Sequence, residues 1–389
     1  MRRYTDSDER RVRTQAEVRE WTRAGLIDTS QAAKLNAELA VELVRTNVFL
    51  RATVAVFTAV IVFAAVGFIM SALGLNNERP IAMVAGAAAL ACIALAEVLV
   101  GVFRLYRFGV EEMLAASGVV LASVSVALFW STWRPGSSQS VVVVGLVVAT
   151  AGGFAIHRRF GFIWAALGAM ICGAAIPFQV RELSANSQRM IAAAVLALVL
   201  VFVRGKRLRH GDEWPGDEYG TLRAAAFAGI YLVLNLRLIE VIKIFSRVHA
   251  HDWFYWGTWM LTWVLPITGL VLSIRDKDRP LLVVSVVMTV LSLVTNKPYL
   301  EWPRHTWDPM LLGVLLIGIA LAMRRWLSSG PDGVRHGFTA AQILRKDDPL
   351  LTVLSAAPIS VTPHAHAPAP APSGFDGGRS GGAGGGGSF

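Results

Sequence analysis

Residues 52–75 read ATVAVFTAVIVFAAVGFIMSALGL, and residues 80–103 read PIAMVAGAAALACIALAEVLVGVF. The first run holds no charged residue, and the second holds only Glu97. A helix needs about 20 consecutive apolar residues to cross the hydrocarbon core of a bilayer. Four polar residues, NNER, separate the two runs and suffice for a short turn. The stretch therefore predicts two adjacent membrane-spanning helices.

The same pattern recurs along the chain and predicts an all-α, polytopic membrane bundle of about ten transmembrane helices. Only 16% of the residues are charged, against about a quarter in soluble domains. The sixth predicted segment has a short uncharged stretch, so either Arg189 snorkels toward the interface or the bilayer thins locally. The ten predicted segments are about 52–75, 80–103, 113–133, 139–157, 160–180, 187–203, 224–245, 253–274, 280–296 and 307–326.

Basic residues gather in alternate loops and account for much of the net charge of +10. Such clusters anchor helix ends against anionic lipid on the cytoplasmic side. The pattern predicts a protein of the cell (inner) membrane with both termini in the cytoplasm. The lipid bilayer is then the expected partner of the basic residues, and no nucleic-acid partner is expected.

Residues 1–47 are predicted to form a cytoplasmic helical hairpin that leads into the first membrane helix near Asn47. A glycine ends the first helix, and Asp28 with Gln31 forms a capping-box pattern for the second. The pattern W-x-x-x-G-L-I-D-x-x-x-A resembles the DUF2157 family of predicted membrane proteins. The resemblance covers only about residues 15–45 and implies no particular activity. The matching residues are Trp21, Gly25, Leu26, Ile27, Asp28 and Ala32.

Residues 48–326 are predicted to be the transmembrane bundle and residues 327–389 a cytoplasmic tail, most of it disordered. The tail contains the Pro-Ala stretch HAPAPAPSG and ends in GGRSGGAGGGGSF, compositions that do not pack into a core. Its glycine-rich end is similar to the tails of some TPM-domain membrane proteins.

Ionisable groups inside a membrane segment are costly and need a partner or a wet cavity. The seventh segment has the most such groups, in LNLRLIEVIKIF. They predict either the polar lining of a solute path or a self-paired structural ladder. Glu97 is a further candidate for the lining, with pairing to Arg104 as its structural alternative. The seventh-segment residues are Asn235, Arg237, Glu240 and Lys243.

Tryptophans in WFYWGTWMLTW fall on one helix face. Trp256, Trp259 and Trp263 can form a platform for a ligand, or they can belong to the aromatic belt at the headgroups. His249, His251 and Asp252 are weak candidates for metal ligands, because their spacing suits a helix poorly. No phosphate-binding, metalloprotease or hydrolase motif occurs in the sequence, and no cofactor is expected.

These features lead first to the hypothesis of a non-enzymatic membrane protein that binds or transports a small solute. The alternative is a membrane-anchored assembly protein that recruits a protein partner through the hairpin, the loop 204–223 and the tail. A third hypothesis is an intramembrane enzyme that acts on a lipid-linked substrate through His249, His251 and Asp252.

Overall fold

The computed structural model describes residues 4, 6–23, 25–134, 138–210, 216–241, 252–276, 278–300, 307–329, 334–335 and 338–339. The chain divides into two units, residues 1–326 and residues 327–389. In the second unit, β1 (Val334–Arg335) pairs antiparallel with β2 (Phe338–Thr339).

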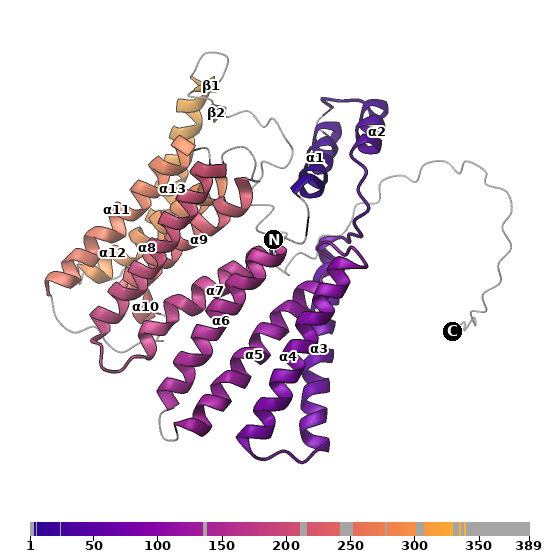
Figure 1. Ribbon diagram of the computed structural model, residues 1–389. Coiled ribbons are helices and arrows are strands. Elements are labelled where there is room, and N and C mark those ends of the chain that lie inside the picture. The colour runs from indigo at the N-terminus through magenta and orange to yellow at the C-terminus, as the bar shows by residue number, and fades with distance from the viewer. Residues whose placement is uncertain are drawn as a thin grey trace, which may run out of the picture. The chain divides into compact units, whose positions relative to one another are not determined.

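The first unit is built from helices (Figure 1). They are α1 (Asp6–Arg23), α2 (Thr29–Glu38), α3 (Val48–Ala72), α4 (Glu78–Gly101), α5 (Val110–Trp133), α6 (Ser138–Phe160), α7 (Ile163–Ala175), the 3-10 turn η1 (Ile176–Gln179), α8 (Ala185–His210), α9 (Gly216–Leu234), α10 (Leu236–Val241), α11 (Trp253–Asp276), α12 (Arg279–Tyr299) and α13 (Asp308–Ser328).

Seven helices in the described part of the chain are long and apolar enough to cross a membrane. This confirms the prediction of a multi-pass helical membrane protein, whereas the count of ten stays a prediction. The seven are α3, α4, α5, α6, α11, residues Ala185–Lys206 of α8 and residues Arg279–Lys297 of α12. Two of the other predicted segments correspond to shorter apolar helices, Ile163–Gln179 and Tyr219–Leu234.

Helix starts follow the local sequence at the N-terminal end. Asp28 caps α2 and forms the predicted capping box with Gln31. The hydrogen bond from the Gln31 backbone amide lowers the pKa of the Asp28 carboxyl, because it stabilises the charged form. Asn47 caps α3 by accepting a hydrogen bond from the Leu50 amide, 2.7 Å away. The assignment of residues 1–47 to a cytoplasmic hairpin stays a prediction.

Small residues on α4 allow α5 to approach closely. Ala82, Ala85, Ala89 and Ala96 are all buried and recur at spacings of three, four and seven residues along one face of α4. Large apolar side chains lie instead on the outer faces of the helices, as the exposure of Leu90 shows. Small residues inside and large apolar residues outside are what a helix bundle in lipid requires.

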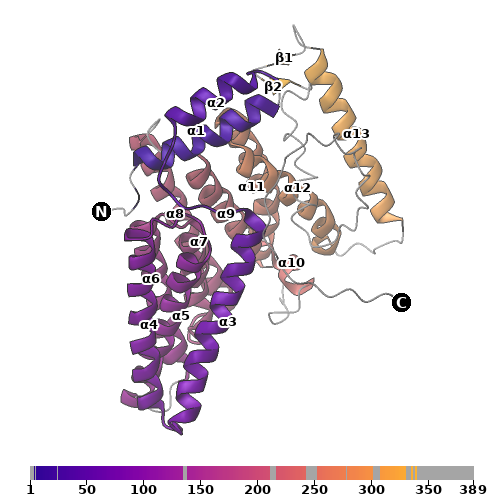
Figure 2. The same cartoon turned by 90° about the vertical axis from the view of Figure 1, so that its right-hand side faces the viewer.

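The pair α11–α12 depends on a proline and a glycine. Pro266 has no amide hydrogen, so the carbonyl of Thr262, four residues earlier, is left to accept another donor. Ser292 Oγ of α12 donates to it at 2.5 Å. Further along the pair, a Cβ placed on Gly269 would lie 2.3 Å from Ser285 Oγ. These contacts allow the two helices to run side by side, as Figures 1 and 2 show.

The close approach at Gly269 predicts a stability effect. Gly269→Ala should lower the free energy of unfolding by about 1–3 kcal/mol through overpacking, because Ser285 is fully buried. The additional change Ser285→Ala should recover part of the loss by removing the hydroxyl. Gly257→Ala in the same helix is the control, since nothing lies within 4 Å of its added Cβ. Thermal unfolding of the purified variants measures the effect, and equal stability of the two single variants would contradict it.

Candidate functional site

The predicted segment 224–245 is not one continuous helix, because the chain breaks between α9 and α10 at Asn235. The Leu236 amide does not continue the helical hydrogen bonds but donates to Tyr299 Oη at 2.7 Å. Asn235 Oδ1 accepts from the Leu238 amide at 3.1 Å and so starts α10 as a cap. The prediction of an unbroken helix was wrong here because Asn235 and Tyr299 supply hydrogen bonds that compete with helix continuation.

A series of buried hydrogen bonds connects Asn235 with α12. Asn235 Nδ2 donates to Tyr231 Oη at 2.9 Å and to Thr295 Oγ1 at 3.2 Å. Tyr231 Oη lies 2.9 Å from Ser292 Oγ, which is also within hydrogen-bond distance of the Thr262 carbonyl at 2.5 Å and the Met288 carbonyl at 2.9 Å. All three hydroxyl-bearing residues are at most 1% exposed. The network thus satisfies polar groups that would each be costly to bury alone.

A second series of contacts connects the helix break with α11. Arg237 Nη2 donates to Tyr255 Oη at 3.1 Å, and its guanidinium carbon lies 5.6 Å from the centre of that ring. Tyr255 Oη donates in turn to the Tyr299 carbonyl at 2.7 Å. The two tyrosine rings are 5.2 Å apart. Asn235 and Arg237, two of the predicted polar residues, therefore belong to one cluster with Tyr255 and Tyr299.

Arg189 of α8 belongs to the same end of the helices. It is only 4% exposed, and its Nη1 has no hydrogen-bond partner in the described part of the chain. The alternative in which Arg189 snorkels to the interface was wrong. Its side chain lies on the buried face of α8 that also carries Ala192 and Leu196, one and two turns further along.

The aromatic face predicted on α11 forms one wall of a groove. Trp259 and Trp263 line a groove of about 410 Å³ together with Met260, Val264 and Asn296. Trp259 Nε1 donates to Asn296 Oδ1 at 3.0 Å. Trp256 does not line the groove, but its ring packs edge-on against Trp259, with centroids 6.0 Å apart. The groove is lined by residues of α11 and α12, and the residues at the helix break are hydrogen-bonded to the same two helices.

The other predicted site residues are not brought to this cluster. Glu97 of α4 forms a bidentate ion pair with Arg159 of α6, at 2.6 and 3.2 Å. Its expected partner, Arg104, pairs with Glu42 instead. The expectation was wrong because the chain turns out of α4 before Arg104, which has a positive φ of 50°. Glu97 is therefore a paired interhelical carboxylate.

Some predicted residues lie outside the described part of the chain. They are Lys243, His249 and His251, together with the side chain of Glu240. Asp252 is described and is exposed. Among the described residues, no group of three His, Cys, Asp or Glu side chains could hold a metal ion.

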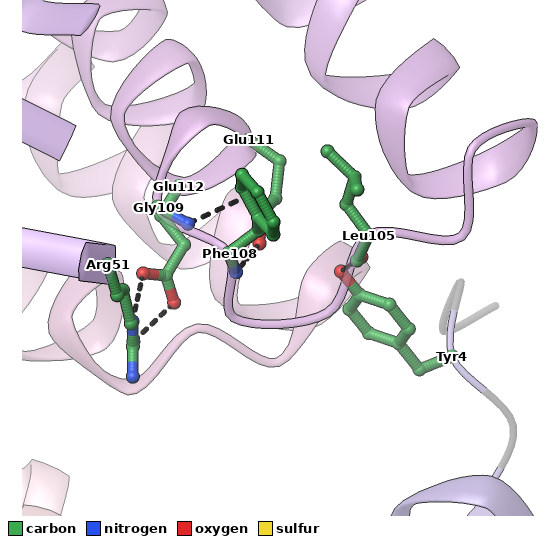
Figure 3. Close-up of polar contacts among 7 residues, drawn as sticks. All are labelled: Tyr4, Arg51, Leu105, Phe108, Gly109, Glu111 and Glu112. Carbon is green, nitrogen blue, oxygen red and sulfur yellow. Dashed lines mark hydrogen bonds and ion pairs between the residues drawn. The ribbon is translucent and has the colours of Figure 1, made fainter. Parts of the chain in front are cut away.

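A second polar cluster lies where α3 and α5 begin (Figure 3). Arg51 and Glu112 form a bidentate ion pair, with contacts of 2.7 and 2.5 Å. Glu111 is fully buried and accepts the backbone amides of Phe108 at 2.8 Å and Gly109 at 3.1 Å. Gly109 has a φ of 111°, and a Cβ there would lie 2.4 Å from the Arg51 carbonyl oxygen.

The N-terminal segment is attached beside this second cluster. Tyr4 Oη donates to the Leu105 carbonyl at 2.7 Å, and its ring packs edge-on against Tyr106. Burial raises the pKa of the Tyr4 hydroxyl, so it remains a donor across the physiological range. Val44 forms a parallel β-bridge with Leu105. These contacts fix the chain between α2 and α3 to the loop between α4 and α5.

The two clusters differ in how their charges are compensated. In the second cluster, Arg51 pairs with Glu112 and two backbone amides hold Glu111, an arrangement that accounts for a structural role. At the helix break, Arg189 has no carboxylate partner among the described residues. We therefore take the helix break and the adjoining groove as the candidate functional site.

Only part of this site could be predicted from the sequence. Asn235, Arg237 and the tryptophans could be found because polar and aromatic residues stand out in apolar segments. Tyr231, Tyr255 and Tyr299 were missed, since tyrosines near helix ends are common in membrane proteins. Their only signal was the presence of small hydroxyl residues in α12, such as Ser292 and Thr295, which can supply partners in the bilayer.

Comparisons with protein-family models, curated proteins and solved structures find no match for the chain. The resemblance to the DUF2157 family and the similarity of the tail to TPM-domain proteins stay predictions.

The helix break predicts a role for one hydroxyl. Tyr299→Phe removes the acceptor of the Leu236 amide and leaves that buried donor without a partner. The free energy of unfolding should fall by about 1–3 kcal/mol, measured by thermal unfolding. Tyr255→Phe provides a comparison within the same ring pair, since it removes donation to a carbonyl but leaves the Leu236 amide bonded. A Tyr299→Phe protein as stable as the parent would mean that the break does not depend on this bond.

The second cluster predicts a different pattern of mutational effects. Glu112→Leu leaves the half-buried Arg51 without its partner and should cost about 3 kcal/mol, whereas Arg51→Leu with Glu112→Leu should recover much of this. Glu42→Gln is the control, because its pair with Arg104 is exposed and should contribute at most about 1 kcal/mol. Thermal unfolding of the variants measures the differences. A double variant no more stable than Glu112→Leu would contradict mutual compensation.

Proposed function

We propose that the protein is a multi-pass membrane protein that binds a small solute at the α9–α10 break and moves it across or within the membrane. The observation that carries the proposal is the interruption of the apolar helix pair α9–α10 beside an open groove. Discontinuous helices with polar groups at the break are typical of transporter binding sites. The groove beside the break, lined by Trp259, Trp263 and Asn296, would hold part of the solute.

Three further features support a binding role. The buried hydrogen bonds of Asn235 and Tyr299 hold the break in one conformation, as a preorganised binding site requires. Two guanidinium groups, those of Arg189 and Arg237, lie at the break. The groove combines indole rings with a side-chain amide, the mixture of apolar walls and few polar groups that small-molecule sites use.

The proposal also covers the orientation of the protein in the membrane and its resemblance to the DUF2157 family. The basic loops support a location in the inner membrane with both termini in the cytoplasm. The helix break would then lie toward the outer side of the membrane. The capped helix α2, with Asp28 and Gln31, is compatible with membership of a DUF2157-type family.

A membrane-anchored assembly protein is the second candidate function. The contacts of Tyr4 and Val44 with the α4–α5 loop support it, because they would hold α1 and α2 as a fixed platform for a protein partner. Leu26, which is 63% exposed, lies on that platform.

The test is complementation of a deletion strain by groove variants. We expect Trp263→Ala and Asn296→Ala to fold normally and to fail to restore the phenotype, because they remove the wall and the polar contact of the groove. Trp133→Ala is the matched control, since this tryptophan at the end of α5 is 83% exposed and far from the groove in sequence. Folding is checked by thermal unfolding and gel filtration.

Full complementation by both groove variants would overturn the solute-binding proposal. If Leu26→Ser failed to complement in that case, the assembly function would be favoured. Failure of the Trp133→Ala control would show that the assay responds to loss of any interfacial tryptophan, and this too would count against a specific groove.

A further inference from the structure

The position of Arg189 follows from the packing of α8 against α9. Leu196 of α8 lies against Gly229, whose added Cβ would be 2.9 Å from a Leu196 methyl group. The two helices are consecutive and antiparallel. Moving seven residues, or about 10 Å, from this contact leads to Arg189 on α8 and to Leu236 on α9–α10. Arg189 therefore lies at the level of the helix break.

The proximity of Arg189 to Tyr299 supports this position. The Arg189 side chain lies near that of Tyr299, and Tyr299 Oη is the acceptor of the Leu236 amide. Arg237 contacts the other tyrosine of the pair, Tyr255. Both arginines therefore lie near the Tyr255–Tyr299 pair at one helix break.

A buried guanidinium without a counter-charge is energetically costly, above all in a membrane protein. Arg189 is 96% buried, and no described carboxylate pairs with it. Its planar fork of donors matches the oxygen atoms of a carboxylate or phosphate. An oxyanion at the break would therefore gain charge-assisted hydrogen bonds and remove the cost of the unpaired charge.

The groove next to the break is suited to an apolar group. Its lining includes Met260 and Val264, which are 60% and 49% exposed. Both lie within α11, a helix long and apolar enough to cross the membrane, so the groove opens where acyl chains would be. Tyr255 and Trp263 are eight residues apart on α11, or about 12 Å along the helix. A single molecule can therefore reach from the break into the groove.

We infer that the ligand of this site is an amphipathic anion, with a carboxylate or phosphate bound by Arg189 at the helix break, beside Arg237, and an apolar chain along the groove. This inference rests on the proposed solute-binding function and gives its ligand class. The chemistry is shared by an anionic lipid and by a free fatty-acid-like solute, both of which can enter from the bilayer.

The test uses the full chain in nanodiscs of phosphatidylcholine and measures quenching of tryptophan fluorescence. The probes are bromine-labelled dodecanoate and the matching uncharged bromine-labelled dodecanol. We expect saturable quenching by the anion at a concentration roughly tenfold or more below that for the alcohol. Trp263→Phe should reduce the quenching by the anion, because that ring lies in the groove.

Arginine variants test the charge requirement. Arg189→Gln should raise the half-saturating concentration of the anion roughly tenfold, toward that of the alcohol. Arg189→Lys should retain part of the preference for the anion, because it keeps the charge and loses the fork. Arg134→Gln is the matched control, since Arg134 is exposed at the end of α5, and it should leave binding unchanged. If Arg189→Gln fails to fold, Arg189→Lys and Arg237→Gln carry the test.

Phosphatidylglycerol in the nanodiscs distinguishes the two sources. Competition with the labelled anion would identify a lipid headgroup as the natural ligand, and absence of competition would identify a free amphiphile; either result supports the inference. Equal affinity for anion and alcohol in the parent protein, or unchanged affinity in folded arginine variants, would overturn it. If both probes still bound saturably and groove variants abolished binding, the proposed solute-binding function would stand while the charge inference failed.

Discussion

The whole fold depends on one constraint, that polar groups inside a bilayer must find partners within the protein. The helices α3 to α6 meet it with ion pairs between neighbouring helices, such as Arg51–Glu112 and Glu97–Arg159. The helices α9, α11 and α12 meet it with neutral hydrogen bonds from Asn235, Tyr231 and Ser292. The ion pairs and the neutral hydrogen bonds each determine which helix faces turn inward. Small residues on those faces then allow neighbouring helices to pack closely.

The neutral network explains how the break between α9 and α10 keeps its backbone groups hydrogen-bonded. At most membrane depths, an interrupted helix would expose amide and carbonyl groups to hydrocarbon at a cost of several kcal/mol each. Here the Leu236 amide donates a hydrogen bond to Tyr299 Oη. The Thr262 carbonyl, which has no helical donor because residue 266 is proline, accepts a hydrogen bond from Ser292 Oγ. The break on α9–α10 and the proline on α11 are thus linked through α12, since both depend on hydroxyl groups that this helix supplies.

The sequence predicted the class of fold well because hydrophobic length is a direct requirement of the bilayer. Runs such as 52–75 and 80–103 have few alternatives to a membrane helix. Pairing between helices could not be predicted in the same way. Glu97 was expected to pair with Arg104 because they are close in sequence, yet its partner Arg159 comes from another helix. Likewise, hydropathy places Arg189 near a helix end but does not say which way its side chain turns, and packing against α9 turns it inward.

The inward position of Arg189 distinguishes it from the paired charges among the described residues. A charge kept for structure has a partner, as Glu112 has Arg51, and the pair contributes to one conformation. A charge kept for binding has to be available, so its site must remain partly uncompensated, and the surrounding fold must bear the cost. The hydrogen bonds of Asn235 and Tyr299 can bear that cost at the helix break, because they hold the backbone in place without using Arg189. Under the proposed function, an oxyanion would therefore bind and leave without rebuilding the helices.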